Sequence, residues 1–278
     1  MLKKVGILFF LLLIACNLQA QRPTRLSRTE FGLMVGGMYY LGDLNPMKQY
    51  YNTQPAAGLI YRFNVHSRLS LRGNFIYGNV GANDAQSSSP LLKNRNLNFK
   101  SSIFELAGGV EFNYLPFEIG HDKYKGTAYL LAELGVFHMN PKTSFNGENI
   151  ALQPLGTEGQ GTTLSSKKNY SLTQLCIPIG AGVRMTLGKR ASLNVEFGLR
   201  KTFTDYLDDV HSDNFVDPVK LADESGGANS DVVALSNRSL DGNIHGKRGT
   251  STTKDWYIFS GIMLTFKLGE KSTCFYHN

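Results

Sequence analysis

The sequence lacks long apolar runs and has little cysteine. After residue 20, no stretch approaches the roughly 18 uninterrupted apolar residues of a membrane-spanning helix, so a helical membrane protein is excluded. Cysteine occurs only 3 times in 278 residues. Cys176 and Cys274 could pair, but two free, small apolar side chains are the simpler interpretation. What remains is a soluble exported protein or a membrane β-barrel, whose strands hide half their residues inside.

Common catalytic signatures are also missing. The chain has no HExxH, CxxC, Walker or GxSxG motif. We therefore expect no enzyme, and no catalytic, cofactor-binding or metal-binding residues. Two alternatives stay open. His138 and Ser144 could belong to a lipid-modifying site at the rim of a small barrel. The aspartates of "DYLDDVHSD" (residues 205–213) could bind calcium, although local turn hydrogen bonds explain them more simply.

The N-terminus has the pattern of an export signal. Lys3 and Lys4 precede an apolar run over residues 5–15, and Ala20 is a suitable cleavage position. The "LIAC" stretch ending at Cys16 resembles a lipobox, so lipidation of Cys16 is the less favoured alternative. The predicted division of the chain is a signal peptide over residues 1–20 and a single β-domain over residues 21–278.

Period-2 alternation dominates the rest of the chain. In residues 102–114, for example, Phe104 and Leu106 alternate with Glu105 and Ala107. Most such segments have about the length of a tilted membrane-spanning strand. Pro178 interrupts one of them and predicts a bulge. The eight predicted strands lie near residues 30–41, 56–64, 69–77, 102–114, 127–137, 171–187, 191–204 and 254–268.

The connections between these strands alternate between longer and shorter. This asymmetry is typical of outer-membrane barrels, which have short periplasmic turns and long extracellular loops. We therefore predict an all-β fold: an eight-stranded, antiparallel, up-and-down transmembrane β-barrel in the bacterial outer membrane, surrounded by outer-membrane lipid, with both termini in the periplasm. The shorter connections are residues 65–68, 115–126 and 188–190, and the longer ones are residues 42–55, 78–101, 138–170 and 205–253.

The predicted lumen is filled rather than open. An eight-stranded barrel is about wide enough for its own side chains. Charges that face the lumen must be paired, because an unpaired buried charge costs several kcal/mol. Acids and arginines nearly balance on the predicted inner face, which favours a structural network over an ion path. Its members are Glu30, Arg62, Arg72, Glu105, Glu111, Glu133, Arg184, Glu196 and Arg200.

The formal net charge is +7, but the positive residues are scattered, so we expect no nucleic-acid partner.

Four short phrases together resemble the PorG-like family of Bacteroidetes outer-membrane β-barrels. They are "YYLGDLNP" (39–46), the stretch beginning "RNLNF" (95–114), "PLGTEGQG" (154–161) and "KTFTDYLDDV" (201–210), and the resemblance runs from about residue 30 to 268. It implies a component of the type IX secretion system that anchors a periplasmic ring made of a PorK-like lipoprotein and a PorN-like protein. In gliding relatives the ring proteins are GldK and GldN.

Two functions from different classes follow. The first is a non-enzymatic assembly component that contacts the ring through the tail 269–278 and through the turn 115–126. This turn is longer than a hairpin requires and carries Glu118, Asp122, Lys123 and Lys125. In this hypothesis the "RNLNF" phrase lies in an outer loop and has no assigned role. The alternative is a surface adhesion or lipid-modifying barrel that acts through its long outer loops, above all residues 205–253.

Overall fold

Eight long strands close into an antiparallel barrel. The computed structural model describes residues 28–227, 230–242 and 246–268. Within them each barrel strand pairs with its neighbours in sequence, and the first pairs with the last, so the sheet has no open edge in the barrel wall. A short strand, β6 (Glu148–Ala151), pairs only with the last four residues of β5, Lys142–Phe145. The barrel strands are β1 (Thr29–Leu41), β2 (Gln54–His66), β3 (Leu69–Asn83), β4 (Asn98–Asn113), β5 (Gly126–Phe145), β7 (Thr173–Leu187), β8 (Ala191–Thr202) and β9 (Trp256–Leu268).

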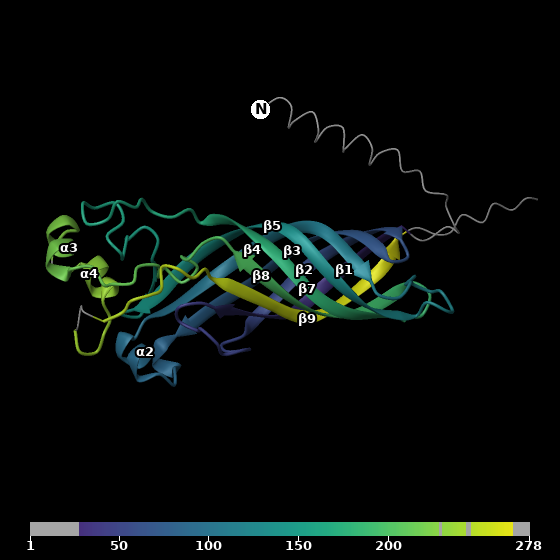
Figure 1. The fold of residues 1–278 in the computed structure, drawn as a ribbon, viewed down its shortest axis with the longest axis horizontal. Helices are drawn as coiled ribbons and strands as arrows, with labels where there is room; N and C mark the ends of the chain where they lie inside the picture. Colours follow the sequence, from purple (N-terminus) through teal and green to yellow (C-terminus); the bar gives the residue numbers. More distant parts are fainter. Residues whose placement is uncertain (1–27, 228–229, 243–245, 269–278) are drawn as a thin grey trace, which may run out of the picture.

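The two ends of the barrel differ sharply (Figure 1). One, the short-turn end, carries the connections 67–68, 114–125 and 188–190. The other, the long-loop end, carries loops 42–53, 84–97, 146–172 and 203–255 together with all the helices of the described residues. In the described residues, no helix has the length and apolar character needed to cross a membrane. The helices are η1 (Asp84–Gln86), α2 (Pro90–Arg95), α3 (Pro218–Glu224) and α4 (Asp231–Ser236).

The predicted fold is confirmed, but several strands are longer than predicted, three of them mainly at the long-loop end. β3, β4 and β5 continue toward the long-loop end by several residues beyond the predicted 69–77, 102–114 and 127–137. Their outward-facing residues become polar there, as at Ser102 and Asn140, while the ladder of backbone pairs continues. The alternation therefore marked the apolar belt of the barrel, not the full length of its strands.

The predicted bulge at Pro178 is wrong. Pro178 pairs with Arg200 of β8 in an unbroken register. On its other side the ladder with β5 is interrupted between the pairs Ala132–Ile179 and Gly135–Cys176, without any shift. The proline thus costs local pairing and adds no residue. The register shift lies instead in β2, between Asn64 and His66, next to a short turn.

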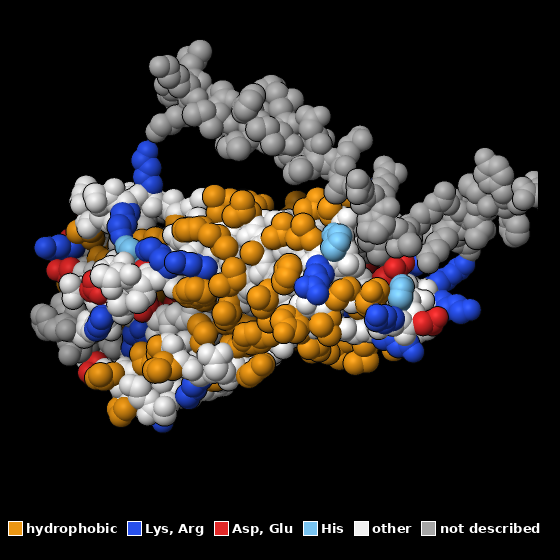
Figure 2. Space-filling model, turned by 45° about the vertical axis from the view of Figure 1, so that its right-hand side comes forward, with side chains coloured by type: hydrophobic (Ala, Val, Ile, Leu, Met, Phe, Trp, Pro, Cys, Tyr) orange, Lys and Arg blue, Asp and Glu red, His pale blue; other side chains and the backbone are white. Residues whose placement is uncertain are grey.

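The outer wall of the barrel is apolar. Figure 2 shows hydrophobic side chains spread over the strands, with lysines and arginines gathered toward both ends. Leu134 is 73% exposed and Leu106 is 62% exposed, values that water-facing strands seldom show for leucine. Apolar-out alternation on every strand is the pattern of a barrel whose solvent is lipid.

The lumen is filled by side chains. Much of its filling is apolar and comes from six strands, β1 to β5 and β9, through residues that are at most 1% exposed: Met34, Met38, Ile60, Ile76, Ile103, Phe137, Met139, Phe259 and Met263. The larger charged group lies toward the short-turn end, the Arg200–Glu105 pair lies at the level of Phe137 and Tyr257, and polar loops cover the long-loop end. The predicted signal peptide (1–20), Cys16 and the tail 269–278 with Cys274 fall outside the described residues.

Candidate functional site

The charged residues predicted for the lumen are all buried, and the structure brings them together. The larger group lies toward the short-turn end. Glu111 of β4 is its centre, because the Glu111 carboxylate contacts three guanidinium groups. It lies 2.8 Å from Arg62 Nε, 3.2 Å from Arg72 Nη1 and 3.1 Å from Arg184 Nη1. Glu30 is farther from its nearest arginine, at 3.7 Å from Arg184 Nη1. The cost of burying the Glu111 carboxylate is therefore offset by three positive charges.

Arg72 extends the network to the next strands. Its guanidinium lies 2.7 Å from Glu196 and 3.1 Å from Glu133. The hydroxyl of Tyr129 donates to Glu196 at 2.9 Å, and the amide of Asn74 donates to Glu133 at 2.7 Å. Strands β3, β5 and β8 are thereby cross-linked through the lumen.

A second, smaller group lies nearer the long-loop end. Arg200 Nε is 3.2 Å from Glu105, which also accepts a 2.6 Å hydrogen bond from the Tyr257 hydroxyl. Glu105 and Glu111 are six positions apart on one strand, about 20 Å, too far to act as a carboxylate pair on one substrate bond.

The turn 114–125 closes the short-turn end of the lumen. Phe117 and Ile119 are each only 3% exposed. The Phe117 ring lies 4.0 Å from the Arg184 guanidinium, and its backbone N–H donates to Ser67 of the β2–β3 turn. Gly120 has φ +78°, and a Cβ there would come within 2.4 Å of the Lys189 carbonyl oxygen. The turn is thus folded across the mouth of the barrel.

This arrangement refines the predicted partner surface. Asp122, Lys123 and Lys125 are exposed, whereas Glu118 is half-buried and its backbone pairs with Tyr124 and His121. The sequence-based prediction considered the charged residues of this turn and missed its two buried apolar ones. Their burial could have been predicted from the sequence, because two large apolar residues, Phe117 and Ile119, stand in a connection too long for a tight hairpin.

The loops of the long-loop end fold into one hydrogen-bonded unit, called here the cap: residues 42–53, 84–97, 146–172 and the described parts of 203–255. The Tyr40 hydroxyl bridges two carboxylates, at 2.5 Å from Asp208 and 2.9 Å from Asp255. Arg95 lies 2.7 Å from Asp84 and also donates to the backbone oxygens of Asp43 and Arg248.

Arg248 is the second organising cation of the cap and is 2% exposed. It contacts Glu158 at 3.2 Å and Thr157 Oγ1 at 3.1 Å. Thr157 in turn donates to Asp209 at 2.5 Å, and the Tyr170 hydroxyl donates to the same carboxylate at 2.7 Å. Each of these bonds joins segments far apart in sequence.

The cap explains the phrases that carry the family resemblance. Arg95, Glu158 and Asp208 come from three of these phrases and lie in the cap, and Tyr40 of β1, from the fourth phrase, is hydrogen-bonded to it. The expected position of "RNLNF" in a loop is wrong in part: Arg95 ends α2, while Asn98 and Phe99 already belong to β4. The structural role of these residues could not be predicted from their neighbours in the sequence, because their hydrogen-bond partners lie in distant loops.

Burial changes the acidity of the cap aspartates. Desolvation raises the pKa of Asp209 to about 6, against the opposing effect of Arg248. Desolvation likewise raises the pKa of Asp205, whose carboxylate lies 2.7 Å from His211 Nδ1, to about 6. Burial also raises the pKa values of Asp208 and Asp255; the charge of Asp255 adds to the rise at Asp208, and the charge of Asp205 adds to the rise at Asp255.

Most carboxylate oxygens of the acidic stretch over residues 205–213 accept hydrogen bonds from the protein, with Asp205 Oδ1 as the exception. Asp208 accepts from the Val210 backbone as well as from Tyr40, and Asp213 accepts from Ser251. In the part of the chain that the structure describes, no group of three or more His, Cys, Asp and Glu side chains is arranged to hold a metal ion.

His138 and Ser144 do not form a site. Both lie on the outer face of β5 rather than beyond its end, six residues apart, or about 20 Å. The His138 ring contacts Thr173 Oγ1 at 3.1 Å. The contact that nucleophilic catalysis requires between the two side chains is therefore missing.

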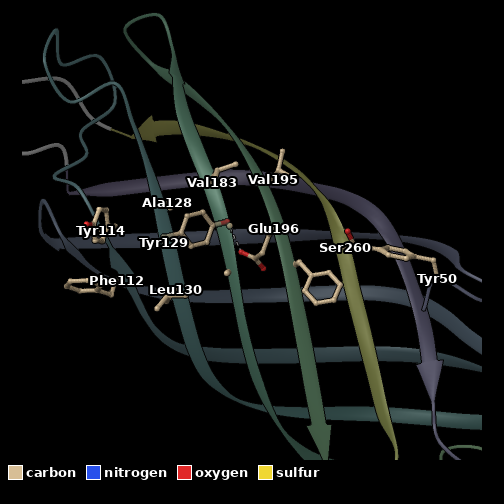
Figure 3. Close-up of a pocket in the computed structure, with 13 residues that line it drawn as sticks. Tyr50, Phe112, Tyr114, Ala128, Tyr129, Leu130, Val183, Val195, Glu196 and Ser260 are labelled. Carbon is tan, nitrogen blue, oxygen red and sulfur yellow. Dashed lines mark hydrogen bonds between the residues drawn. The ribbon is translucent and has the colours of Figure 1, made fainter. Parts of the chain in front are cut away.

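A shallow groove of about 660 Å³ runs over the outer wall. Figure 3 shows side chains from neighbouring strands along it, with Tyr129 and Glu196 joined by a hydrogen bond behind the wall. The register aligns Ser260, Phe197, Ala181, Leu130 and Phe112 in one row across five strands. The groove is apolar and open to the surroundings of the barrel, and it carries no group suited to chemistry.

Together the closed lumen, the folded cap and the apolar wall define a small, plugged β-barrel. The chain belongs to the family described as "Domain of unknown function (DUF6089)", which matches residues 3–231. No curated protein is detectably similar to it in sequence.

Solved structures with a similar fold are small barrels. Neisserial surface protein A is 7% identical, with a TM-score of 0.42 over 86% of this chain and 96% of that one. Ail, the attachment invasion locus protein of Yersinia pestis, is 10% identical, with a TM-score of 0.42 over 87% and 98%. OprG from Pseudomonas aeruginosa is 9% identical, with a TM-score of 0.36 over 87% and 99%. Values this low say nothing about function.

Proposed function

We propose that this protein is a non-enzymatic outer-membrane barrel of the type IX secretion machinery. Its short-turn end faces the periplasm and anchors or organises a ring of PorK-like and PorN-like proteins. The apolar wall supports the membrane location, since only lipid favours so many exposed leucines and phenylalanines. The assignment of the short turns to the periplasm follows the usual asymmetry of such barrels.

The observation that carries the proposal is the closed lumen. Charged layers fill it, Phe117 and Ile119 close one mouth, and the cap closes the other. A barrel without a passage acts through its surfaces. The secretion role itself rests on the four phrases that resemble the PorG-like family, together with the exposed, charged turn at the end where a periplasmic ring would bind.

The test is affinity isolation with a surface variant of this turn. Deleting the whole turn would remove Phe117 and Ile119 and open the barrel, so the better change is Lys123→Ser with Lys125→Ser. Both side chains are exposed, and neither closes the lumen. We expect the variant to insert normally and to lose co-purification of the ring proteins.

The matched control is Lys167→Ser with Lys168→Ser, which removes the same charge from an exposed part of the cap. It should co-purify the ring as the unchanged protein does. Normal co-purification with the turn variant would refute this contact. Absence of ring proteins from every sample, including the unchanged barrel, would refute the secretion role.

A second candidate function, surface adhesion, is favoured by exposed apolar residues on the cap. Leu91 of α2 is 82% exposed and Leu240 is 73% exposed, and the Leu240 N–H donates to the backbone oxygen of Asn94 in the same helix, α2. Apolar side chains this exposed on a water-facing surface are typical of contact sites. Changing both leucines to serine should reduce adherence of cells and leave secretion unchanged; a loss of secretion would instead connect the cap with the secretion role.

A further inference from the structure

Two lysines face each other on the outer wall, just above its apolar belt. Lys100 of β4 and Lys142 of β5 are direct register partners, and both side chains are exposed. Their next neighbours in the same row are Gly81 on β3 and Ala151 on β6, which carry no charge. The row therefore presents two ammonium groups side by side.

This pairing is unfavourable on its own. Directly opposed residues have Cβ atoms about 5 Å apart, and like charges at that spacing destabilise a sheet. Elsewhere lysines of this protein do meet carboxylates, as Lys247 meets Asp213 at 3.9 Å. Among the described residues, neither Lys100 nor Lys142 has a carboxylate within ion-pair distance. A counter-ion from outside the protein would relieve the repulsion.

The position of the two lysines along the barrel axis indicates which counter-ion is available to them. The apolar outer face of β4 ends at Phe104, whose ring lies 4.7 Å from that of Tyr77. Polar Ser102 follows, and then Lys100. Four residues span about 13 Å along a strand, or about 10 Å along the barrel axis at the usual tilt. Lys100 and Lys142 thus stand at the level where the phosphates of membrane lipids lie.

The surroundings fit an amphiphile. Below the lysines, the Tyr77–Phe104 pair and Val136 offer an apolar surface to acyl chains. His138, exposed and in contact with Thr173, lies in the same row as Phe104 and is the titratable group on the adjacent part of β5. A phosphate placed between the two ammonium groups would make charge-assisted contacts with both.

We propose that Lys100 and Lys142 bind the phosphate of a phosphorylated lipid in the outer leaflet. The inference rests on the proposed outer-membrane location and orientation and is independent of the secretion role. It adds a lipid-headgroup site that fixes the depth and rotation of the barrel in its membrane.

The experiment uses the full-length barrel purified in a non-ionic detergent. Lipid A is added with its phosphates or after their enzymatic removal, and native mass spectrometry counts the lipid retained. We expect the unchanged protein to prefer the phosphorylated form by about tenfold, the value of one or two charge-assisted contacts. Lys100→Ser with Lys142→Ser should abolish this preference.

The matched control, Lys125→Ser with Lys189→Ser, removes two exposed charges at the short-turn end and should retain the preference. Equal retention of both lipid forms, or unchanged preference in the Lys100 and Lys142 variant, would overturn the proposal. Calorimetric binding of inorganic phosphate alone with the same affinity would show that free phosphate, not a lipid, is the ligand. Affinity isolation of ring proteins with the Lys100 and Lys142 variant separates this result from the secretion role, because the contact between the barrel and the ring proteins should persist in that variant.

Discussion

At the scale of single residues, the lumen is built so that each acid has more than one partner. Glu111 is the strongest case, since it meets Arg62, Arg72 and Arg184 within 3.2 Å. Buried charges stabilise little relative to apolar packing, but the loss of one partner leaves the others uncompensated. The network therefore makes the lumen intolerant of single changes.

Glu111→Ala should lower the free energy of unfolding by about 3–5 kcal/mol, because three buried guanidinium groups lose their shared carboxylate. The measurement is urea unfolding of the barrel in lipid vesicles, followed by tryptophan fluorescence of Trp256. Glu148→Ala, at an exposed position of β6, is the control and should change stability little. Equal stabilities of the two variants would mean that the arginines are compensated by water or by other residues.

A second residue-scale prediction concerns Asp209 in the cap. Its folded-state pKa is raised to about 6, so the folded state binds the proton more tightly than the unfolded state does. The resulting stabilisation is complete below the unfolded value near 3.8 and is lost as the pH rises through about 6. A difference of this size is worth up to about 3 kcal/mol.

Hydrogen exchange in residues 157–170, corrected for intrinsic rates, should thus show better protection at pH 5 than at pH 7.5. Asp209→Asn should flatten this dependence, because the titrating group is gone. Arg248 and Glu158 also face this region and remain unchanged in the variant. A profile that persists in Asp209→Asn would assign the effect to another group, with Asp205 the first candidate.

At the scale of elements, the repeating alternation of the sequence predicted the strands, but contacts between residues far apart in the sequence could not be predicted. Alternation located all eight strands because an apolar outer face and a filled lumen impose period 2. It underestimated β5, whose outer residues turn polar at His138 while pairing continues to Phe145. The inner charges could be predicted one strand at a time, but the choice of Arg200 for Glu105 depends on the barrel's closure.

The turn 114–125 shows the same limit and permits a third prediction. Replacing Phe117 and Ile119 with alanine should release the turn from the mouth of the barrel, since both are buried there. We expect trypsin to cleave after Lys123 and Lys125 much faster than in the unchanged protein. Leu115→Ala, at a half-exposed position, should leave cleavage slow. Unchanged cleavage in the double variant would show that hydrogen bonds such as that from the Gly120 N–H to the Thr186 hydroxyl hold the turn by themselves.

At the scale of the whole molecule, the barrel is a plug with two different ends. The cap joins four loops through Arg95 and Arg248, the lumen is layered with apolar and paired charged side chains, and a folded turn covers the opposite mouth. An eight-stranded barrel has little room for a pore even without these devices. Under the proposed secretion role, exported cargo would therefore pass beside the barrel.

We expect the reconstituted barrel to conduct no ions in planar lipid bilayers. The reason is steric and electrostatic, because water and ions have no continuous path past Met38, Arg72 and Phe117, all of them buried. Insertion is verified separately by the change in gel mobility on heating, so that silence is not mistaken for failed insertion. Stepwise conductance, or swelling of liposomes in small sugars, would contradict the closed lumen and with it the main support for a surface-acting assembly protein. A silent but correctly inserted barrel leaves its outer surfaces, the cap and the turn 114–125, as the places where the protein acts.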